Sequence, residues 1–131
     1  MVAKLTHLAL PCHDLEKTMA WYEKFTPMTV THKREDKGSK VAWIEASDAS
    51  IFLVFLQSPN SEGPNPVLSP FAHLGIEMTS EEEVNAIAEE GENHKCLVWK
   101  PRQEPYPVGY ICALSDPDGN LVEFSYGQGI S

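Results

Sequence analysis

The sequence shows the same order of predicted elements twice, once on each side of a proline-rich segment. Each half begins with a short apolar strand, continues with an amphipathic helix, and ends with three further strand segments. The segment between the halves, Ser58–Pro66, contains three prolines and one glycine, a composition typical of a linker. This repeat predicts a single domain built from two βαβββ modules, at residues 1–57 and 71–131, with a linker at residues 58–70.

The boundaries of the expected elements follow from hydrophobic periodicity and from turn and cap residues. In the first module we expect a helix at Leu15–Phe25, with Asp14 as its N-cap. The strands of this module are expected at Leu5–Leu10, Met28–Lys33, Lys40–Glu45 and Ile51–Gln57. In the second module, Ser80 and Glu83 have the spacing of a capping box, and Gly91 is expected to end the helix. The strands of the second module are expected at Phe71–Met78, Cys96–Lys100, Gly109–Leu114 and Leu121–Tyr126.

The uncovered face of each expected sheet predicts how the modules combine. One helix can cover only one face of a four-stranded sheet, so the uncovered faces of the two sheets are expected to meet each other. We therefore expect an α+β fold in which the two βαβββ modules form a curved, barrel-like sheet. The concave side of such a sheet is available for a small-molecule ligand.

The composition argues against several classes of protein. A formal net charge of −9, with no long run of lysine and arginine, argues against a nucleic-acid partner. Three cysteines without CxxC spacing argue against a disulfide framework and for a reducing compartment. The N-terminal residues lack the apolar run of a signal peptide, and no segment has the length and apolar character of a membrane span. We therefore expect a soluble, cytoplasmic protein.

Three polar side chains fall within expected strands that are otherwise apolar. His7 and His73 occupy the same position in the opening strands of the two modules, and Glu123 lies in the middle of the last strand. A lone strand histidine is usually a hydrogen-bonded structural residue, and a lone glutamate near a strand end is usually solvated. Together on a concave surface, the three would form a two-histidine, one-carboxylate site for Fe(II), Mn(II), Ni(II) or Zn(II). The ion would also offset the cost of burying the carboxylate.

Several segments of the chain resemble a known family. His7–Leu10 and His13–Tyr22 resemble the family's opening strand and helix, Phe71–Ile76 resembles its second opening strand, and Ser115–Phe124 resembles its closing segment. Along nearly its whole length the sequence is similar to the vicinal oxygen chelate superfamily, also called the glyoxalase, bleomycin-resistance and extradiol dioxygenase superfamily. The resemblance implies a fold of two βαβββ modules, a small-molecule substrate, and a homodimer in which the modules of two chains complete each site.

In metal-dependent members of this family, the ligands come from the first and last strands of each module. The resemblance therefore implies that His7, His73 and Glu123 bind a divalent ion, and that Glu123 is also a catalytic residue. A substrate with neighbouring oxygen atoms would chelate the ion, which would act as a Lewis acid. The activities implied are those of a lyase, an isomerase, a thiol transferase or a dioxygenase.

The fourth ligand position of the family falls on the expected strand at Ile51–Gln57. Alignment of the preceding turns places Leu53 opposite the last strand's glutamate, and other registers would place Phe55 or Gln57 there. This strand offers no carboxylate, which argues against lactoylglutathione lyase, the activity of glyoxalase I with its four protein ligands.

The remaining candidate residues are those expected to contact a substrate. They are Leu53, Phe55, Gln57, Trp99, Arg102 and Tyr110. The proline-bearing loop Pro101–Pro107 is expected to shape the pocket entrance. The sequence leaves an alternative function open: a non-catalytic binding or resistance protein of the bleomycin-resistance type, which would hold a planar compound in an apolar cup.

Overall fold

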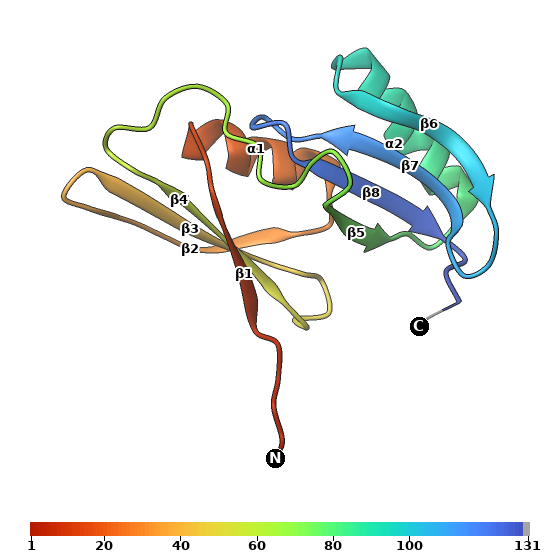
Figure 1. Cartoon of the computed structure of the whole chain (residues 1–131), viewed down its shortest axis with the longest axis horizontal. Helices are drawn as coiled ribbons and strands as arrows, with labels where there is room; N and C mark the ends of the chain where they lie inside the picture. Colours follow the sequence, from red (N-terminus) through yellow and green to blue (C-terminus); the bar gives the residue numbers. More distant parts are fainter. Residues whose placement is uncertain (130–131) are drawn as a thin grey trace. The chain divides into compact units, whose positions relative to one another are not determined.

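The structure is a computed structural model that describes residues 1–129 of the chain. It divides into two compact units, Met1–Val67 and Leu68–Ser131, with a boundary inside the segment predicted as a linker. Each unit contains an open four-stranded sheet and one helix, and the described strands form no closed barrel (Figure 1). The α+β class and the βαβββ order predicted for each half are therefore confirmed.

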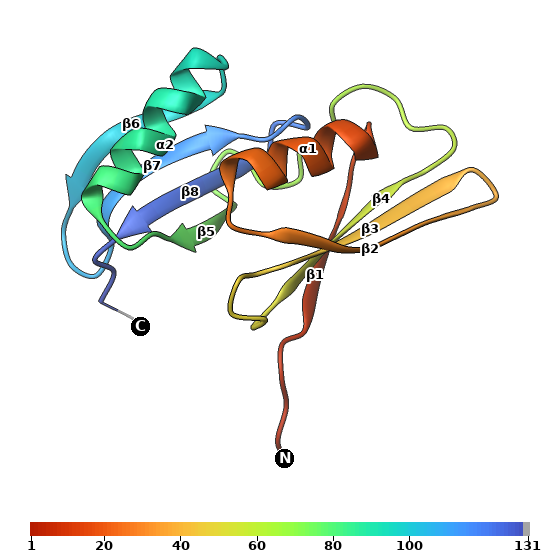
Figure 2. The ribbon, with the colours of Figure 1, turned by 180° about the vertical axis from the view of Figure 1, so that it is seen from behind.

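The first unit consists of a strand, a helix and three further strands. Its elements are β1 (His7–Pro11), α1 (Leu15–Phe25), β2 (Thr29–Asp36), β3 (Ser39–Glu45) and β4 (Phe52–Gln57). The sheet order is β1-β4-β3-β2, in which β1 and β4 are parallel and the other pairs are antiparallel. Helix α1 packs on one face of this sheet (Figure 2), where the rings of Tyr22 and Phe55 lie 5.0 Å apart between centroids.

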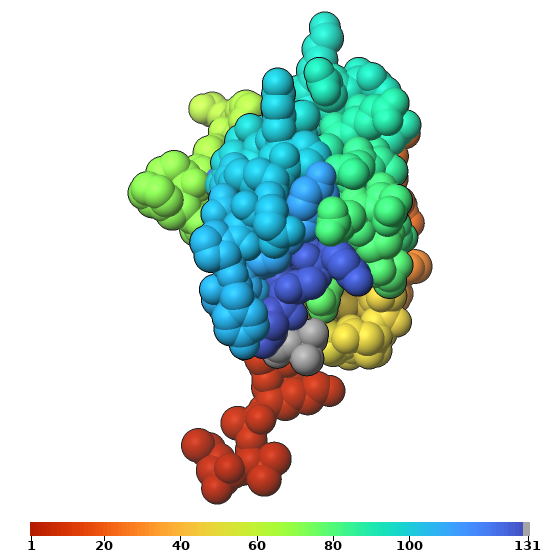
Figure 3. Space-filling view, turned by 90° about the vertical axis from the view of Figure 1, so that its right-hand side faces the viewer, coloured from red at the N-terminus to blue at the C-terminus, as the bar shows by residue number. Residues whose placement is uncertain are grey.

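The second unit repeats this arrangement. Its elements are β5 (His73–Glu77), α2 (Glu81–Asn93), β6 (Leu97–Glu104), β7 (Gly109–Ser115) and β8 (Leu121–Tyr126). The sheet order is β5-β8-β7-β6, again with one parallel pair, β5 and β8. Figure 3 shows α2 and β6 next to each other on one surface of this unit. Within residues 1–129, no helix has the length and apolar character that crossing a membrane would require.

Side-chain caps explain where both helices begin. Asp14 accepts a hydrogen bond from the backbone N of Lys17 at 3.2 Å, and Ser80 accepts one from the backbone N of Glu83 at 3.1 Å. The carboxylate of Glu83 reaches back to Thr79, accepting from its hydroxyl and from its backbone N. These bonds, the one from the hydroxyl first, lower the pKa of Glu83. The N-terminal signals read from the sequence are therefore satisfied in the structure.

The prediction that Gly91 ends the second helix is wrong. Helix α2 continues to Asn93, His94 is its C-cap, and Lys95 takes the left-handed conformation with φ of 61°. Gly91 is buried inside the helix, and a Cβ atom at this position would lie only 2.7 Å from Cγ of Leu114 in β7. Glycine is therefore required at this position because the helix backbone passes close to the sheet.

We predict that Gly91→Ala lowers the free energy of unfolding by about 1–2 kcal/mol. Alanine is the better helix former by about 1 kcal/mol, but the side chain of Leu114 is fully buried and can move only by displacing its packed neighbours. Denaturant unfolding measures the change, with Glu89→Ala on the exposed side of the same helix as the control. Equal stability of the Gly91 variant and the wild type would contradict the close approach.

Strand β6 is longer than the sequence indicates. The expected strand Cys96–Lys100 is observed as Leu97–Glu104, so the first residues of the expected loop Pro101–Pro107 belong to the strand. A proline is tolerated there because β6 is an edge strand, and because its pairing with β7 shifts register between Trp99 and Arg102. The connection to β7 is therefore a short turn. The prediction of a loop at Pro101–Pro107 is wrong for the residues up to Glu104, which belong to β6.

Candidate functional site

The alternation of side chains along β8 separates two faces of the second sheet. Phe124 pairs with Cys112 of β7, whose thiol lies 3.6 Å from the backbone carbonyl of Val84 in α2. Phe124 is therefore on the helix side, and Glu123 lies on the opposite side. We call the side that carries Glu123 the open face of the second sheet.

Glu123 is nearly buried although it is a carboxylate. Its exposed fraction is 7%, and its neighbours on the adjacent strands are the small residues Gly75 and Ala113. Its Oε1 atom lies 3.8 Å from Nε2 of His73, a separation too long for a direct hydrogen bond. The structure thus brings together two of the three predicted ligands.

The backbone fixes the tautomer of His73. The Nδ1 atom of this ring lies 2.7 Å from the carbonyl oxygen of Phe71. A carbonyl oxygen can only accept, so Nδ1 carries a hydrogen and donates it. In the neutral ring the lone pair is then on Nε2, the atom that lies near Glu123. Metal-binding histidines use this arrangement, in which the second ring nitrogen donates to a backbone carbonyl or a carboxylate.

The separation of these two donor atoms is compatible with one divalent ion. Bonds from such an ion to nitrogen or oxygen are about 2.0–2.2 Å long, so two donors on it lie at most about 4.4 Å apart. The 3.8 Å between His73 and Glu123 is within this limit. Imidazole and carboxylate donors suit Fe(II), Mn(II), Ni(II) and Zn(II). Within residues 1–129, no group of three or more His, Cys, Asp or Glu side chains is placed to hold a metal, so the described residues show a pair of candidate donors and no complete site.

Two side chains of β6 extend the open face beside His73. The indole of Trp99 meets the imidazole edge to face, with ring centroids 5.9 Å apart. The guanidinium of Arg102 lies over the indole at 5.1 Å, and its Nε donates to a carboxylate oxygen of Glu104 at 2.5 Å. Two of the six predicted substrate contacts, Trp99 and Arg102, therefore lie in one row with His73.

The structure places the other four predicted substrate contacts on the helix sides of the two sheets. They are Leu53, Phe55, Gln57 and Tyr110. Leu53 and Phe55 are buried on the α1 side of the first sheet, and the Gln57 side-chain oxygen accepts from the backbone N of Leu15 at 2.8 Å. The Tyr110 hydroxyl donates to the side-chain oxygen of Asn85 in α2 at 2.6 Å. Phe55, Gln57 and Tyr110 therefore contact a helix, and Leu53 is buried on the same side of its sheet as Phe55.

His7 lies on the side of the first sheet that faces away from α1. Its Nδ1 atom is 2.9 Å from the hydroxyl of Thr6. Its ring centroid is 5.4 Å from that of Trp43, which is in turn 5.6 Å from that of Phe52. The predicted ligand of the first unit is therefore set among aromatic side chains.

Val54 is the counterpart of Glu123 in the first unit, and the alignment that predicted Leu53 is wrong by one residue. In the second unit, Gly75 is the second residue after the histidine and pairs with Glu123. In the first unit, Ala9 is the second residue after the histidine and pairs with Val54. The loop before β4 is one residue longer than the loop before β8, which shifts any alignment based on the turns. A buried valine thus stands where the second unit has a carboxylate.

Cys112 lies behind Glu123 and has no nucleophilic character. Burial, and secondly the negative charge of Glu123, raise the pKa of the Cys112 thiol to about 12. At neutral pH the thiol is protonated, and a protonated thiol is neither a nucleophile nor a good metal ligand. The chemistry of the open face therefore belongs to the imidazole and the carboxylate.

Two further side chains near Glu123 were not identified as site residues from the sequence. The side-chain amide of Gln128 donates to Oε2 of Glu123 at 3.4 Å. The hydroxyl of Ser125, which is 1% exposed, has no hydrogen-bond partner in the described part of the chain. One sequence feature could have pointed to Gln128, namely its position between Gly127 and Gly129. Two glycines so close together favour a turn, which can bring the chain back toward the strand before it.

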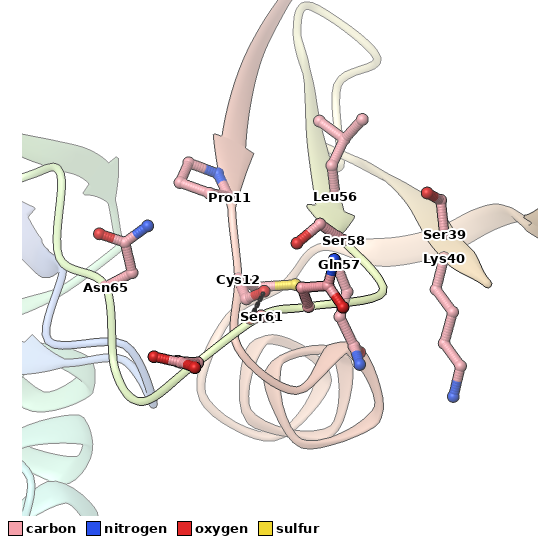
Figure 4. Close-up of a pocket in the computed structure, with 11 residues that line it drawn as sticks. Pro11, Cys12, Ser39, Lys40, Leu56, Gln57, Ser58, Ser61 and Asn65 are labelled. Atoms are coloured by element: carbon pink, nitrogen blue, oxygen red, sulfur yellow. Dashed lines mark hydrogen bonds between the residues drawn. The ribbon is translucent and has the colours of Figure 1, made fainter.

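The first unit contains a pocket that is separate from these groups. It has a volume of about 470 Å³ and lies where β1 and β4 end, beside the segment at residues 58–65 (Figure 4). The hydroxyl of Ser61 donates to the backbone carbonyl of Cys12 across it at 3.3 Å. Gln57 is the predicted site residue that lines this pocket, while His7 lies at the opposite end of β1.

A duplicated βαβββ unit, with an imidazole and a nearly buried carboxylate on an open face of the second sheet, defines a class of small α+β proteins built from two such units. Residues 4–124 match the family model of the Glyoxalase/Bleomycin resistance protein/Dioxygenase superfamily. The chain belongs to this superfamily, and the resemblance noted in its sequence is confirmed.

Relatives of known sequence or structure agree with this assignment. An uncharacterised protein of Pseudomonas aeruginosa is 44% identical over 128 residues, which are 98% of this chain and 91% of that protein. The fosfomycin resistance protein FosX of Listeria monocytogenes has a TM-score of 0.77 and 19% identity, covering 98% of this chain and 97% of that one. TnmS3, an antibiotic binding protein from Streptomyces, has a TM-score of 0.72 and 18% identity, covering 97% and 98%. At these identities the two structural likenesses show the shared fold.

Proposed function

We propose that this chain is a cytoplasmic, divalent-metal-dependent enzyme. Its proposed substrate is a small molecule with neighbouring oxygen atoms. The observation that carries the proposal is the pairing of His73 with Glu123. The imidazole donates Nδ1–H to a backbone carbonyl, and its Nε2 lies 3.8 Å from a carboxylate with little solvent around it. The likeness to FosX supports the proposal, because a mutant of that protein is complexed with Mn(II) and a dihydroxypropylphosphonic acid.

His7 is the proposed third ligand. We take the two units as modules of a single domain, and we propose a homodimer in which His7 comes from the same chain or from a second copy. Two imidazoles and one carboxylate leave coordination positions open for substrate oxygens. Any fourth protein ligand would have to come from outside β4, because Val54 occupies the matching position.

Each residue of the open face has a proposed task in the reaction. Glu123 contributes the negative charge that balances a dication and is the proposed catalytic residue, and His73 contributes a neutral donor whose orientation is fixed. A bound divalent ion supplies Lewis acidity that stabilises negative charge on a substrate oxygen. Trp99 gives an apolar wall beside His73, and Arg102 gives a cation, partly balanced by Glu104, for an anionic part of the substrate. This set suits lyase, isomerase, thiol transferase or dioxygenase chemistry.

The proposal predicts that the purified protein binds one of the four metals with a large gain in stability. At a free metal concentration 100 times Kd, binding adds about 2.7 kcal/mol, which raises Tm by roughly 10 °C for a domain of this size. Thermal unfolding with Fe(II), Mn(II), Ni(II) and Zn(II) measures the shift. We expect His73→Ala to remove it and the control His94→Ala, which alters the exposed C-cap histidine after α2, to retain it. The absence of a shift with all four metals would contradict the proposal.

A second candidate function is non-catalytic binding of a planar small molecule. It is favoured by the aromatic cluster of His7, Trp43 and Phe52 on the first sheet, where Val54 replaces a carboxylate. The likeness to the antibiotic binding protein TnmS3 also supports it. Quenching of tryptophan fluorescence by a planar aromatic probe in metal-free protein, lost with Trp43→Phe and weakened by Phe52→Ala, would favour this function over the enzyme.

A further inference from the structure

The two carboxylate oxygens of Glu123 have different partners. Oε1 lies nearest to Nε2 of His73, at 3.8 Å, whereas Oε2 accepts a hydrogen bond from the side-chain amide of Gln128 at 3.4 Å. The described residues place no lysine or arginine in an ion pair with this carboxylate. This nearly buried charge therefore has an imidazole near one oxygen and a neutral amide at the other.

The chain segment that carries Gln128 is fixed on both sides. Before it, β8 ends at Tyr126, and Gly127 has a φ of 82°, a left-handed conformation that turns the chain back. After it, the backbone N of Gly129 donates to the carbonyl of Pro107 at 3.1 Å, and the hydroxyl of Tyr106 donates to the carbonyl of Gly129 at 3.4 Å. These contacts hold the segment on the turn between β6 and β7.

Gly129 is also a position where the backbone approaches a side chain very closely. A Cβ atom at residue 129 would overlap the ring of Tyr106, an exposed side chain that would have to move to admit a larger residue. The two hydrogen bonds of Gly129 therefore fix the backbone next to the half-buried side chain of Gln128. A fixed backbone favours a side chain that orients another group.

We propose that Gln128 is a positioning residue for Glu123. Its amide holds Oε2, so that the carboxylate presents Oε1 to the ion beside Nε2 of His73. The inference rests on the metal site proposed above. Because the amide is neutral, it orients the carboxylate without cancelling the charge that attracts a dication, which a lysine at this position would do. Carboxylate ligands of metals are commonly hydrogen-bonded in this way, and loss of such a partner typically weakens metal binding by about 10–100-fold.

A binding experiment distinguishes this role from simple packing. Gln128→Met keeps the length and approximate volume of the side chain but removes the N–H group, and Gln128→Ala removes both. We expect both variants to bind Mn(II) about 10–100-fold more weakly than the wild type in calorimetric titration. The metal-free proteins should keep a Tm within about 2 °C of the wild type, because the hydrogen bond is long and partly exposed. The matched control is Gln103→Met, which alters an exposed glutamine on β6.

Each outcome has one meaning. Weaker Mn(II) binding by both Gln128 variants, with unchanged binding by the Gln103 control, supports the positioning role. Normal binding by Gln128→Met overturns it, and weak binding by Gln128→Ala alone would then show that the side chain only fills space. If the wild type itself binds no Mn(II), the proposed metal site fails and the inference fails with it. If the wild type binds Mn(II) and both Gln128 variants bind it equally well, only the inference about Gln128 fails.

Discussion

Glu123→Gln is expected to abolish Mn(II) binding at concentrations that saturate the wild type. The substitution keeps the shape of the side chain but removes the charge that a dication needs, and it deletes a proposed ligand rather than the partner of one. The loss should therefore exceed the roughly 100-fold limit that applies to partners of ligands. Calorimetric titration and metal content after desalting both measure it.

The same substitution should stabilise the metal-free protein. Glu123 is 7% exposed with no basic partner other than His73 in the described residues, so its charge costs stability when no ion is bound. An amide at this position could donate to Nε2 of His73, and we expect the free energy of unfolding to rise by about 1 kcal/mol. Glu89→Gln, an exposed carboxylate on α2, is the control that should change neither quantity. Unchanged Mn(II) binding in the Glu123 variant would place the ligands elsewhere.

Val54→Glu is expected to destabilise the metal-free protein by about 3 kcal/mol or more, because it buries a carboxylate without a cation. Val54 is 6% exposed and occupies the register position of Glu123, on the sheet side that carries His7. The new carboxylate and His7 would repeat the pairing seen between Glu123 and His73. We therefore expect saturating Mn(II) to restore about 2–3 kcal/mol of the lost stability.

Leu53→Glu is the matched control for this experiment. It buries a carboxylate one residue away on the same strand, but on the side packed against α1, where His7 cannot reach it. Denaturant unfolding with and without Mn(II) should show recovery for the Val54 variant and none for the Leu53 variant. If Mn(II) restored the stability of both variants equally, or of neither, position 54 would not be the counterpart of Glu123 in metal binding.

Local signals explain why so much of the fold could be predicted from the sequence. The bounds of α1 were predicted correctly because Asp14 caps the helix and apolar residues recur at helical spacing up to Phe25. The bounds of β8 were also predicted correctly, because the turn chemistry before Leu121 defines where the strand starts. In both cases the determining residues are close neighbours in the chain.

The errors come from contacts between distant residues and from a difference in loop length that leaves no local signal. Gly91 was taken as a helix end, but it is required by the side chain of Leu114 more than twenty residues away. The counterpart of Glu123 was placed at Leu53 because the extra residue in the loop before β4 is absorbed without any sequence signal. Likewise, nothing near Tyr110 in the sequence shows that its hydroxyl bonds to α2.

Part of the candidate site could be predicted from the sequence, and part of it depends on tertiary contacts. Pairing of His73 with Glu123 follows from strand alternation and from the repeat, both of which are visible in the sequence. The hydrogen bond from Gln128 depends on a tail that folds back over the turn between β6 and β7, and such a return is a tertiary event.

The atom that orients His73 belongs to the main chain, and this affects how the protein can evolve. Every residue type at position 71 offers the same carbonyl oxygen, so mutation there cannot delete the hydrogen-bond acceptor. The side chain of Phe71 is 87% exposed and takes no part in that contact. Position 71 is therefore free to vary for other purposes, such as contact with a partner, while the imidazole keeps its orientation.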